Sequence, residues 1–150
     1  MRRDLDAPLA DAPLPAALTL LPFDIDTARL CRELMNHVYA AGFGDSAVAF
    51  DAWWTWVTTD ADYAPELMFV AAEQGRVVGF CHCWRDGFIK DLVVDRAWRK
   101  RGLGAALLTM ALAASTARGI PFVDLKTDID NATAQSLYRH LGFRIVERVG

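Results

Sequence analysis

The sequence of 150 residues predicts an α/β (α+β) fold, in which a mixed, mainly antiparallel sheet carries helices on both faces. Two observations lead to this expectation. Three consecutive β-type runs in the middle of the chain are separated only by short turns, a pattern typical of an antiparallel meander. The third run leads through a basic, Gly-containing turn into a long Leu- and Ala-rich segment and another β-type run, which indicates a βαβ crossover. A meander that feeds a crossover implies a mixed sheet with helices on both faces.

A strand and a helix are expected before the meander. Residues 16–21 suit a first strand, and Asp26 is a suitable N-cap for a helix over residues 27–41. Gly42 and Gly44 would end that helix. Its predicted apolar face, at helical spacing, consists of Leu30, Leu34 and Val38.

A second helix is expected to follow, with Asp45 or Ser46 as its N-cap. Large apolar residues then repeat at i, i+3, i+4 and i+7, which is the spacing of one buried helix face. These residues are Phe50, Trp53, Trp54 and Val57. Packing is therefore the expected role of the two tryptophans on this face.

The remaining elements continue the alternation of strands and helices. Gln74 and Gly75 form the tight turn of a hairpin, and Gly119 followed by Pro121 closes the long helix. The predicted order is β-α-α-β-β-β-α-β-α-β. The expected ranges are strands over 67–73, 76–84, 88–94, 122–126 and 143–149, and helices over 102–117 and 131–141.

Composition indicates one folded domain. With 53% hydrophobic and 23% charged residues, the chain is typical of a globular protein rather than a disordered one. Three of the six prolines lie within residues 1–15, so we expect a mobile N-terminal arm and a single domain over residues 16–150. No apolar run reaches the roughly 18 residues that span a bilayer, and no apolar signal core follows Met1. We therefore expect no membrane association and a cytoplasmic location.

Cysteines and charge restrict the kinds of ligand. Cys31, Cys81 and Cys83 are odd in number and lack metal-site spacing, so we expect free buried thiols and no bound metal. Residues 1–75 contain 4 Arg and no Lys against 12 acidic residues, whereas residues 76–150 contain 12 basic against 7 acidic residues. The acidic first half argues against a nucleic-acid partner. The basic second half favours an anionic ligand, although solvated surface charge would explain the same asymmetry.

The segment over residues 99–104 joins an expected strand to an expected helix and has the features of an anion site. A helix N-terminus offers backbone N–H groups without intrahelical partners, together with the positive end of the helix dipole. Gly102 and Gly104 let the chain approach a phosphate closely, and three neighbouring cations add positive charge. An ordinary βα turn with a solvated basic cluster is the alternative. The three cations are Arg99, Lys100 and Arg101.

Two motifs resemble those of the GNAT superfamily of N-acetyltransferases, which transfer an acetyl group from acetyl-CoA to amines. The first is similar to the strand and pyrophosphate loop of that family and reads Leu92-Val93-Val94 followed by Arg99-x-x-Gly102-x-Gly104. The second is similar to its Asn-containing helix and reads Asn131-x-x-Ala134-x-x-Leu137-Tyr138, continuing into Leu141-Gly142-Phe143. The resemblance covers residues 16–149. It implies a GNAT-like fold and acetyl-CoA as the co-substrate.

The resemblance also implies how CoA would bind. Backbone amides of residues 101–104 would hold the pyrophosphate. The strand that ends at Val94 would splay from the strand over 122–126, and main-chain groups near Leu92 would bind the pantetheine arm and polarise the thioester carbonyl. Asn131 would bind that arm or cap its helix. The implied CoA-binding residues are Leu92, Val93, Val94, Arg99, Lys100, Arg101, Gly102, Leu103, Gly104, Asn131, Ala134 and Tyr138.

Tyr138 is the implied general acid, because the family has a tyrosine of this helix near the sulfur and a phenol is protonated at neutral pH. The resemblance does not transfer a general base, since Phe88 stands where some members have Glu. Candidates by position are Asp91, His82 and Asp124. Each candidate, like the tyrosine, has a structural alternative as a packed or hydrogen-bonded side chain. Deprotonation through water is a further alternative.

The acceptor site is expected over the first two helices and the loop after them, where the family varies most. Acidic residues beside aromatic ones in this region favour a small cationic amine or a peptide N-terminus, through charge pairing and cation–π contact. Trp56 lies off the packed helix face and is the main candidate for substrate contact, with Asp60 and Tyr63 near it in the sequence.

One departure from the family concerns the end of the chain. Members commonly have two strands after the Leu141-Gly142-Phe143 segment, and this sequence has room for one before Gly150. A sheet edge or a partner strand must compensate, which makes a homodimer an expectation. Two other functions stay open: a non-catalytic CoA-binding or regulatory module of the same fold, and an unrelated nucleotide-binding α/β protein.

Overall fold

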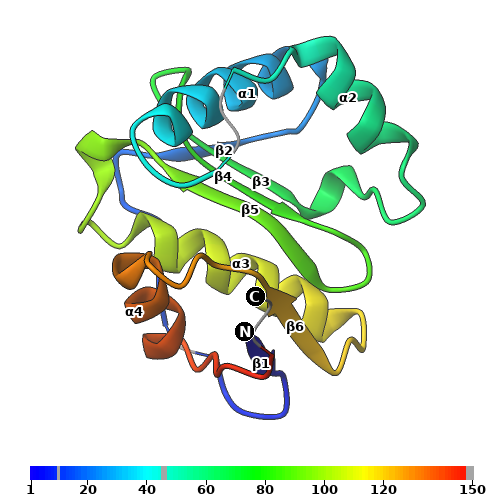
Figure 1. The fold of residues 1–150 in the computed structure, drawn as a ribbon, viewed down its shortest axis with the longest axis vertical. Coiled ribbons are helices and arrows are strands. Elements are labelled where there is room, and N and C mark those ends of the chain that lie inside the picture. The colour runs from blue at the N-terminus through cyan, green and yellow to red at the C-terminus, as the bar shows by residue number, and fades with distance from the viewer. Residues whose placement is uncertain (10, 45–46, 148–150) are drawn as a thin grey trace.

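The computed structural model describes residues 1–9, 11–44 and 47–147, and within them a six-stranded sheet forms the centre of the molecule (Figure 1). The strand order is β1-β6-β5-β4-β3-β2, and among these described strands only β5 and β6 pair in parallel. The strands are β1 (Arg2–Asp4), β2 (Thr19–Leu21), β3 (Met68–Glu73), β4 (Arg76–Cys83), β5 (Phe88–Val94) and β6 (Phe122–Leu125). The helices are α1 (Ile25–Ala40), α2 (Phe50–Thr59), α3 (Leu103–Ala117) and α4 (Ala132–His140), with short 3-10 helices η1 (Pro65–Leu67) and η2 (Arg96–Trp98). None of the described helices is long and apolar enough to cross a membrane.

Helices cover both faces of the sheet, as predicted: α1 and α2 lie on one face, and α3 and α4 on the other (Figure 1). Each face has its own apolar core, because successive side chains of a strand point to opposite faces. On β4, Phe80 belongs to the core beneath α1 and α2 with Trp53, whereas Cys81 belongs to the core beneath α3 with Leu107. The predicted meander and βαβ crossover are therefore confirmed.

Helix α3 packs closely on β4. A Cβ at Gly79 would lie 2.9 Å from Leu103 Cδ2 and 3.0 Å from Leu107 Cδ1, so any larger residue would require these leucine side chains or the helix to shift. The Leu- and Ala-rich face of the helix is buried, as the sequence predicts. This contact fixes the first turn of α3 against the sheet, and with it the loop that precedes the helix.

The N-cap of α1 differs from the prediction, and its predicted apolar face is confirmed in part: Leu34 is buried and Val38 packs against the core. Asp24, rather than Asp26, is the N-cap: its side chain accepts the Thr27 N–H at 2.9 Å, and its own N–H donates to the Thr27 hydroxyl at 2.9 Å. This reciprocal capping box places the helix start two residues earlier. Leu30 is 39% exposed. The buried residues of the helix are Ala28, Cys31, Arg32, Leu34 and Met35.

The predicted caps of α2, Asp45 and Ser46, lie outside the described residues. Helix α2 begins at Phe50 after Ala49, which makes no side-chain capping hydrogen bond. Its packed face agrees with the prediction. Trp53 and Val57 are buried, and Trp54 is half-buried with its ring centre 5.8 Å from that of Phe23.

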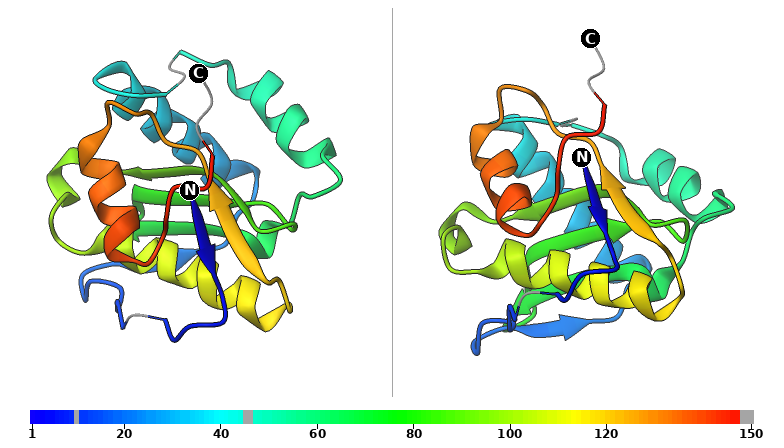
Figure 2. Two further views of the ribbon diagram at one scale, coloured as in Figure 1. Left: turned by 60° about the horizontal axis from the view of Figure 1, so that its bottom comes forward. Right: turned by 90° about the horizontal axis from the view of Figure 1, so that it is seen from below.

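At the edge of the sheet beyond β6, two predictions are wrong: the final strand and the mobile N-terminal arm. The predicted strand over 143–149 does not form within its described part, residues 143–147, where Arg144 makes an isolated bridge with Arg2. Residues 148–150 lie outside the described part of the chain. Residues 2–4, which were expected in a mobile arm, form β1 and pair antiparallel with β6 (Figure 2).

Side-chain contacts of Arg2 and Arg3 explain why this segment joins the sheet. Arg2 Nε donates to Asp124 Oδ1 at 2.8 Å across the β1–β6 pair. Arg3 is buried, with 6% of its surface exposed. Its guanidinium donates to the backbone carbonyls of Asp4, Pro8 and Leu141. Strand β1 thus occupies the position beside β6 for which a partner strand was expected, and it becomes the edge strand of the sheet there.

Replacing Arg3 by Met tests this edge. The variant keeps most of the apolar stem but leaves the Leu141 and Pro8 carbonyls without their donor, so we expect the free energy of unfolding to fall by about 1–3 kcal/mol in urea titrations. The matched control is Arg118→Met, which breaks an exposed ion pair with Glu66 and should cost less than about 1 kcal/mol. Equal losses in the two variants would contradict the role of the buried guanidinium.

Candidate active site

The loop before α3 has the backbone geometry of an anion site. Lys100 and Gly102 adopt left-handed φ angles of 61° and 82°. The first hydrogen bond of the helix runs from the Ala106 N–H to the Gly102 carbonyl at 3.0 Å. The N–H groups of residues 103–105 precede this ladder and are available at the positive end of the helix dipole. The loop over 99–104 therefore presents main-chain donors where the sequence predicts them.

Two glycines suit this loop for different reasons. A Cβ at Gly102 would meet nothing within 4 Å, so the left-handed φ alone favours glycine there. A Cβ at Gly104 would lie 3.2 Å from Leu137 Cδ2 and 3.7 Å from Val94 Cγ2. The first turn of α3 thus lies against α4 and the end of β5, which brings the two predicted motifs together. The basic side chains are exposed, and the Arg101 guanidinium lies 4.7 Å from the centre of the Trp98 ring.

Strands β5 and β6 pair over a short distance and then diverge. The parallel register joins Phe88 to Asp124 and Ile89 to Leu125, and no further β5–β6 pair is recorded among the described residues. Residues 91–94 of β5 continue in register with β4. The side of β5 that faces away from β4 therefore carries main-chain groups without a strand partner, as the predicted splay requires. In this part of β5, Leu92 and Val94 are half-buried on the face covered by α3, and Val93 is buried on the face covered by α1 and α2.

A cavity of about 670 Å³ opens at this divergence. Its wall comes from α1, the α1–α2 loop, α2, β5, the segment after β6, and α4. The described lining residues are Arg32, Tyr39, Phe43, Gly44, Val48, Ala52, Trp53, Trp56, Lys90, Asp91, Leu92, Lys126, Thr127, Asp128, Asn131 and Tyr138. Five residues proposed from the sequence thus meet in one space: Trp56, Asp91, Leu92, Asn131 and Tyr138.

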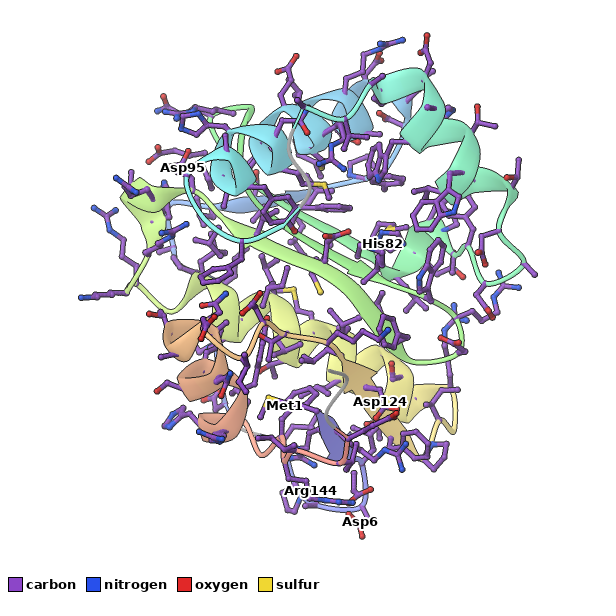
Figure 3. All side chains as sticks on the ribbon, viewed as in Figure 1. Met1, Asp6, His82, Asp95, Asp124 and Arg144 are labelled. Carbon is purple, nitrogen blue, oxygen red and sulfur yellow. The ribbon has the colours of Figure 1, made fainter. Side chains whose placement is uncertain are left out.

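Other predicted residues lie elsewhere. Asp60 is exposed at the end of α2, and Tyr63 packs with its ring centre 6.4 Å from that of Phe23; neither is among the described lining residues of the cavity. Asp124 is held by Arg2 through two hydrogen bonds of 2.8 and 3.1 Å. Figure 3 shows Asp124 beside Met1, at the end of the molecule away from α1.

Asp91 is a nearly buried carboxylate in the wall of the cavity. Its side chain is 11% exposed. The Tyr39 hydroxyl donates to Asp91 Oδ1 at 2.6 Å. Lys90 Nζ and His82 Nδ1 lie 3.8 and 4.0 Å from Asp91 Oδ2. One carboxylate oxygen of Asp91 therefore accepts a hydrogen bond from a tyrosine, and the other lies near a cation and a neutral imidazole.

Tyr138 reaches the same cavity from α4. The residue is 9% exposed, and its ring packs 5.9 Å from that of Phe143 in the core beneath α3. Burial, with a smaller contribution from nearby Asp91, raises the pKa of Tyr138 to about 12. The phenol is therefore a proton donor throughout the neutral range.

Asn131 fixes the start of α4. Its side chain accepts the N–H of Ala134 at 3.2 Å, so the capping role that the sequence allowed is confirmed. Because Asn131 also lines the cavity, capping and ligand contact are compatible at this position. Ala134 packs against the core beneath α3.

Sequence and fold both match one family. The model of the acetyltransferase (GNAT) family matches residues 29–143, which span the cavity and the loop before α3. This chain belongs to the GNAT family. The crystal structure of a GCN5-related N-acetyltransferase from Sphaerobacter thermophilus is similar, with 28% identity and a TM-score of 0.78, and the match covers 94% of this chain and 45% of that one.

Curated relatives are also acetyltransferases by name. A mycothiol acetyltransferase from Clavibacter michiganensis subsp. michiganensis is 34% identical over 91% of this chain and 45% of that protein. N-alpha-acetyltransferase 30 from Schizosaccharomyces pombe is 32% identical over 53% of this chain and 58% of that protein. The chain spans about half the length of these curated relatives. Solved structures that share the GNAT fold include complexes with CoA.

The buried histidine of this GNAT chain is shielded from the cavity. His82 has no exposed surface, and neither ring nitrogen has a hydrogen-bond partner among the described residues. The Trp84 ring lies 4.2 Å from it, and Figure 3 shows His82 between the sheet and α2. Burial, followed by the charge of Lys90, lowers the pKa of His82 to about 3. The imidazole is neutral at neutral pH, so its 4.0 Å approach to Asp91 is not an ion pair.

The three cysteines are free and buried, as predicted. Burial raises the pKa of Cys83 to about 11 and also raises the pKa of Cys31 and Cys81. These side chains are thiols rather than nucleophilic thiolates at neutral pH. The described residues contain no group of three or more His, Cys, Asp or Glu suited to a metal ion.

Sequence patterns did not point to two cavity residues of α1, Arg32 and Tyr39. Arg32 is 5% exposed, donates from Nε to Asn36 Oδ1 at 3.0 Å, and has its guanidinium 5.4 Å from the Trp53 ring centre. One signal was available, because a charged residue on the buried face of an amphipathic helix is rare without a specific contact. The predicted apolar face, with Leu34 at its centre, did not include Arg32.

Replacing His82 by Leu tests its burial in the neutral form. The unfolded chain binds a proton at His82 below about pH 6.5 and the folded protein does so only near pH 3. The free energy of unfolding therefore falls as pH drops through this window, by about 1.4 kcal/mol per pH unit from this residue. Between pH 7 and pH 5, His82→Leu should lose about 2 kcal/mol less stability than the wild type in urea titrations. An equal loss of unfolding free energy in the wild type and in His82→Leu would contradict the burial of a neutral imidazole.

Proposed function

We propose that this protein is an acetyl-CoA-dependent N-acetyltransferase that moves an acetyl group to a primary amine by direct attack in a ternary complex. The observation that carries the proposal is the presence of Asp91 and Tyr138 in one cavity, at the point where β5 leaves β6. An ionised carboxylate and a protonated phenol are the two proton-transfer groups that this reaction uses. Membership in the GNAT family supports the same chemistry.

The loop before α3 and the unpaired side of β5 are proposed to bind acetyl-CoA, which supplies the acetyl thioester. The N–H groups of residues 103–105 and the left-handed turn at Gly102 suit a pyrophosphate. Main-chain groups of residues 92–94 suit the amides of the pantetheine arm, and an N–H there would stabilise the oxyanion. The proposed CoA-binding residues are Leu92, Val93, Val94, Arg99, Lys100, Arg101, Gly102, Leu103, Gly104, Asn131, Ala134 and Tyr138.

Asp91 is the proposed general base. An acceptor ammonium must lose a proton before its lone pair can attack the thioester carbonyl, and the Asp91 carboxylate lies in the cavity wall where an acceptor would enter. His82 is less suited, because it is fully buried and does not line the described cavity. Asp124 is engaged by Arg2.

Tyr138 is the proposed general acid. The amine nitrogen forms a bond to the carbonyl carbon, the carbon–sulfur bond breaks, and the phenolic O–H gives its proton to the departing sulfur. The products are an N-acetyl amide and CoA. With a pKa of about 12, Tyr138 carries its proton at neutral pH, so the proton is present when the sulfur departs.

The acceptor is proposed to be a small cationic amine or a peptide N-terminus. Aromatic side chains on the α1–α2 side of the cavity suit contact with such a group, and Trp56 is 50% exposed at this wall. A relative named as an N-alpha-acetyltransferase supports a peptide N-terminus. Of the three acceptor residues suggested by the sequence, Trp56 is therefore proposed for direct contact with the acceptor. Asp60 and Tyr63 are not among the described residues that line the cavity, so any effect of theirs on the acceptor would be indirect.

A screen of amines and short peptides for CoA release, with the wild type and Tyr138→Phe, tests the proposal. We expect the wild type to acetylate at least one acceptor, and the variant to lose about 100-fold in kcat because it has no acid for the leaving sulfur. Acetyl-CoA should still raise the melting temperature of the variant, because Tyr138→Phe keeps the ring and the main-chain donors of the loop before α3.

Three outcomes of the screen separate the possible functions. Full turnover by Tyr138→Phe would remove the tyrosine from the mechanism. Stabilisation by acetyl-CoA without acetylation of any amine would favour a non-catalytic CoA-binding module. Stabilisation by ATP or NAD, but not by acetyl-CoA, would contradict the proposal as a whole.

Gly102→Ala tests the CoA loop, with Gly119→Ala at the far end of α3 as its control. Both glycines have a left-handed φ, 82° and 75°, and a Cβ at either would meet nothing within 4 Å. Each substitution should therefore cost a similar free energy of unfolding, about 1 kcal/mol. Only Gly102→Ala should weaken the binding of CoA in calorimetry, by about tenfold, because only this loop presents the amides. Equal affinities in the two variants would exclude the loop as the pyrophosphate site.

A further inference from the structure

We propose that Tyr39, at the end of α1, is a positioning residue that holds the Asp91 carboxylate in place for proton transfer. The inference rests on the proposed function, in which Asp91 takes the proton of the acceptor amine. Its basis is the hydrogen bond from the Tyr39 hydroxyl to Asp91 Oδ1, at 2.6 Å, inside the cavity wall. The two residues are 52 positions apart in the sequence, and they come from neighbouring layers, Tyr39 from helix α1 and Asp91 from strand β5.

The ring of Tyr39 is itself held in place. A Cβ at Gly44 would lie 2.6 Å from the Tyr39 ring, so the backbone of the α1–α2 loop is pressed against the face of the ring. Gly44 has a φ of +118°, which permits this approach. The loop backbone restricts the ring on this side, and the hydroxyl of the ring so placed meets Asp91 Oδ1. The hydrogen bond to Asp91 is therefore preorganised before an acceptor enters.

The hydroxyl acts as a donor and not as an acid. Burial, followed by the negative charge of Asp91, raises the pKa of Tyr39 well above its usual value, so the proton stays on the phenol over the whole working range. A donor to a carboxylate favours the ionised form, which is the form that accepts a proton from an ammonium. The hydrogen bond also fixes the rotation of the carboxylate about its Cβ–Cγ bond.

Other charged or titratable groups face Asp91 from every element around it. Lys90, on the same strand, lies 3.8 Å from Oδ2, and His82, on β4, lies 4.0 Å from the same oxygen and is neutral. Tyr39 thus bonds Oδ1, whereas Lys90 and His82 lie near Oδ2. The remaining groups are Arg32 on α1 and Tyr138 on α4.

Tyr39→Phe removes the hydroxyl and keeps the ring that supports the loop. We expect kcat to fall about tenfold, KM for acetyl-CoA to stay unchanged, and the acidic limb of the kcat profile to move to higher pH by about one unit. The control is Thr116→Val, which loses a hydroxyl that donates to the Leu112 carbonyl in α3, away from the cavity. Its kinetic constants and pH profile should match those of the wild type. An unshifted acidic limb in Tyr39→Phe would overturn the proposal.

A double-mutant cycle with Asp91→Asn separates this inference from the function on which it rests. If Tyr39 acts through Asp91, then Tyr39→Phe should cost nothing further in the Asp91→Asn background. The same tenfold loss in both backgrounds would overturn the positioning role.

Full activity of Asp91→Asn would instead overturn Asp91 as the base. A large loss in Asp91→Asn with an unaffected Tyr39→Phe would overturn only the role of Tyr39. If turnover by Asp91→Asn is too slow to measure in both backgrounds, the shift of the acidic limb in the kcat profile of Tyr39→Phe decides whether Tyr39 positions Asp91.

Discussion

The structure depends on the early end of the parallel pairing between β5 and β6. The two strands pair through Phe88 and Ile89, after which β5 runs on to Val94 beside β4. Backbone N–H and C=O groups require partners, so a central strand with one unpaired side is stable only where solvent or a ligand can reach it. The same divergence leaves space for the first turn of α3 to meet α4, at Gly104 and Leu137.

The divergence also lets the two faces of the sheet share one cavity. Asp91 is bonded by Tyr39 of α1, on one face, whereas Tyr138 belongs to the core beneath α3, on the other. Where the sheet is continuous, its backbone separates these layers. At the splay both side chains reach the same cavity, so the Asp91 carboxylate and the protonated phenol of Tyr138 line one space while each keeps its own surroundings. A site of this kind can remove and supply a proton on opposite sides of one bond.

The sheet is closed at one edge by the chain itself. Strand β1 pairs with β6, and the buried Arg3 guanidinium binds carbonyls of segments that would otherwise lie open. Sequence patterns did not indicate this pairing, because the Pro-rich composition of residues 1–15 outweighs a strand of three residues. Pairing of such a short strand depends on distant partners such as Asp124 and not on local propensity.

The meander, the crossover and the loop before α3 could be predicted from the sequence, because strand alternation, helical periodicity and glycine turns are local signals. Which polar residues meet depends on packing between distant segments. Asp91 and His82 are paired opposite each other on neighbouring strands, yet one lines the cavity and the other has no exposed surface. Tyr39 reaches Asp91 across 52 positions. Spacing along a strand gives the face of a side chain but not the helix that covers it, and that cover sets both burial and partner.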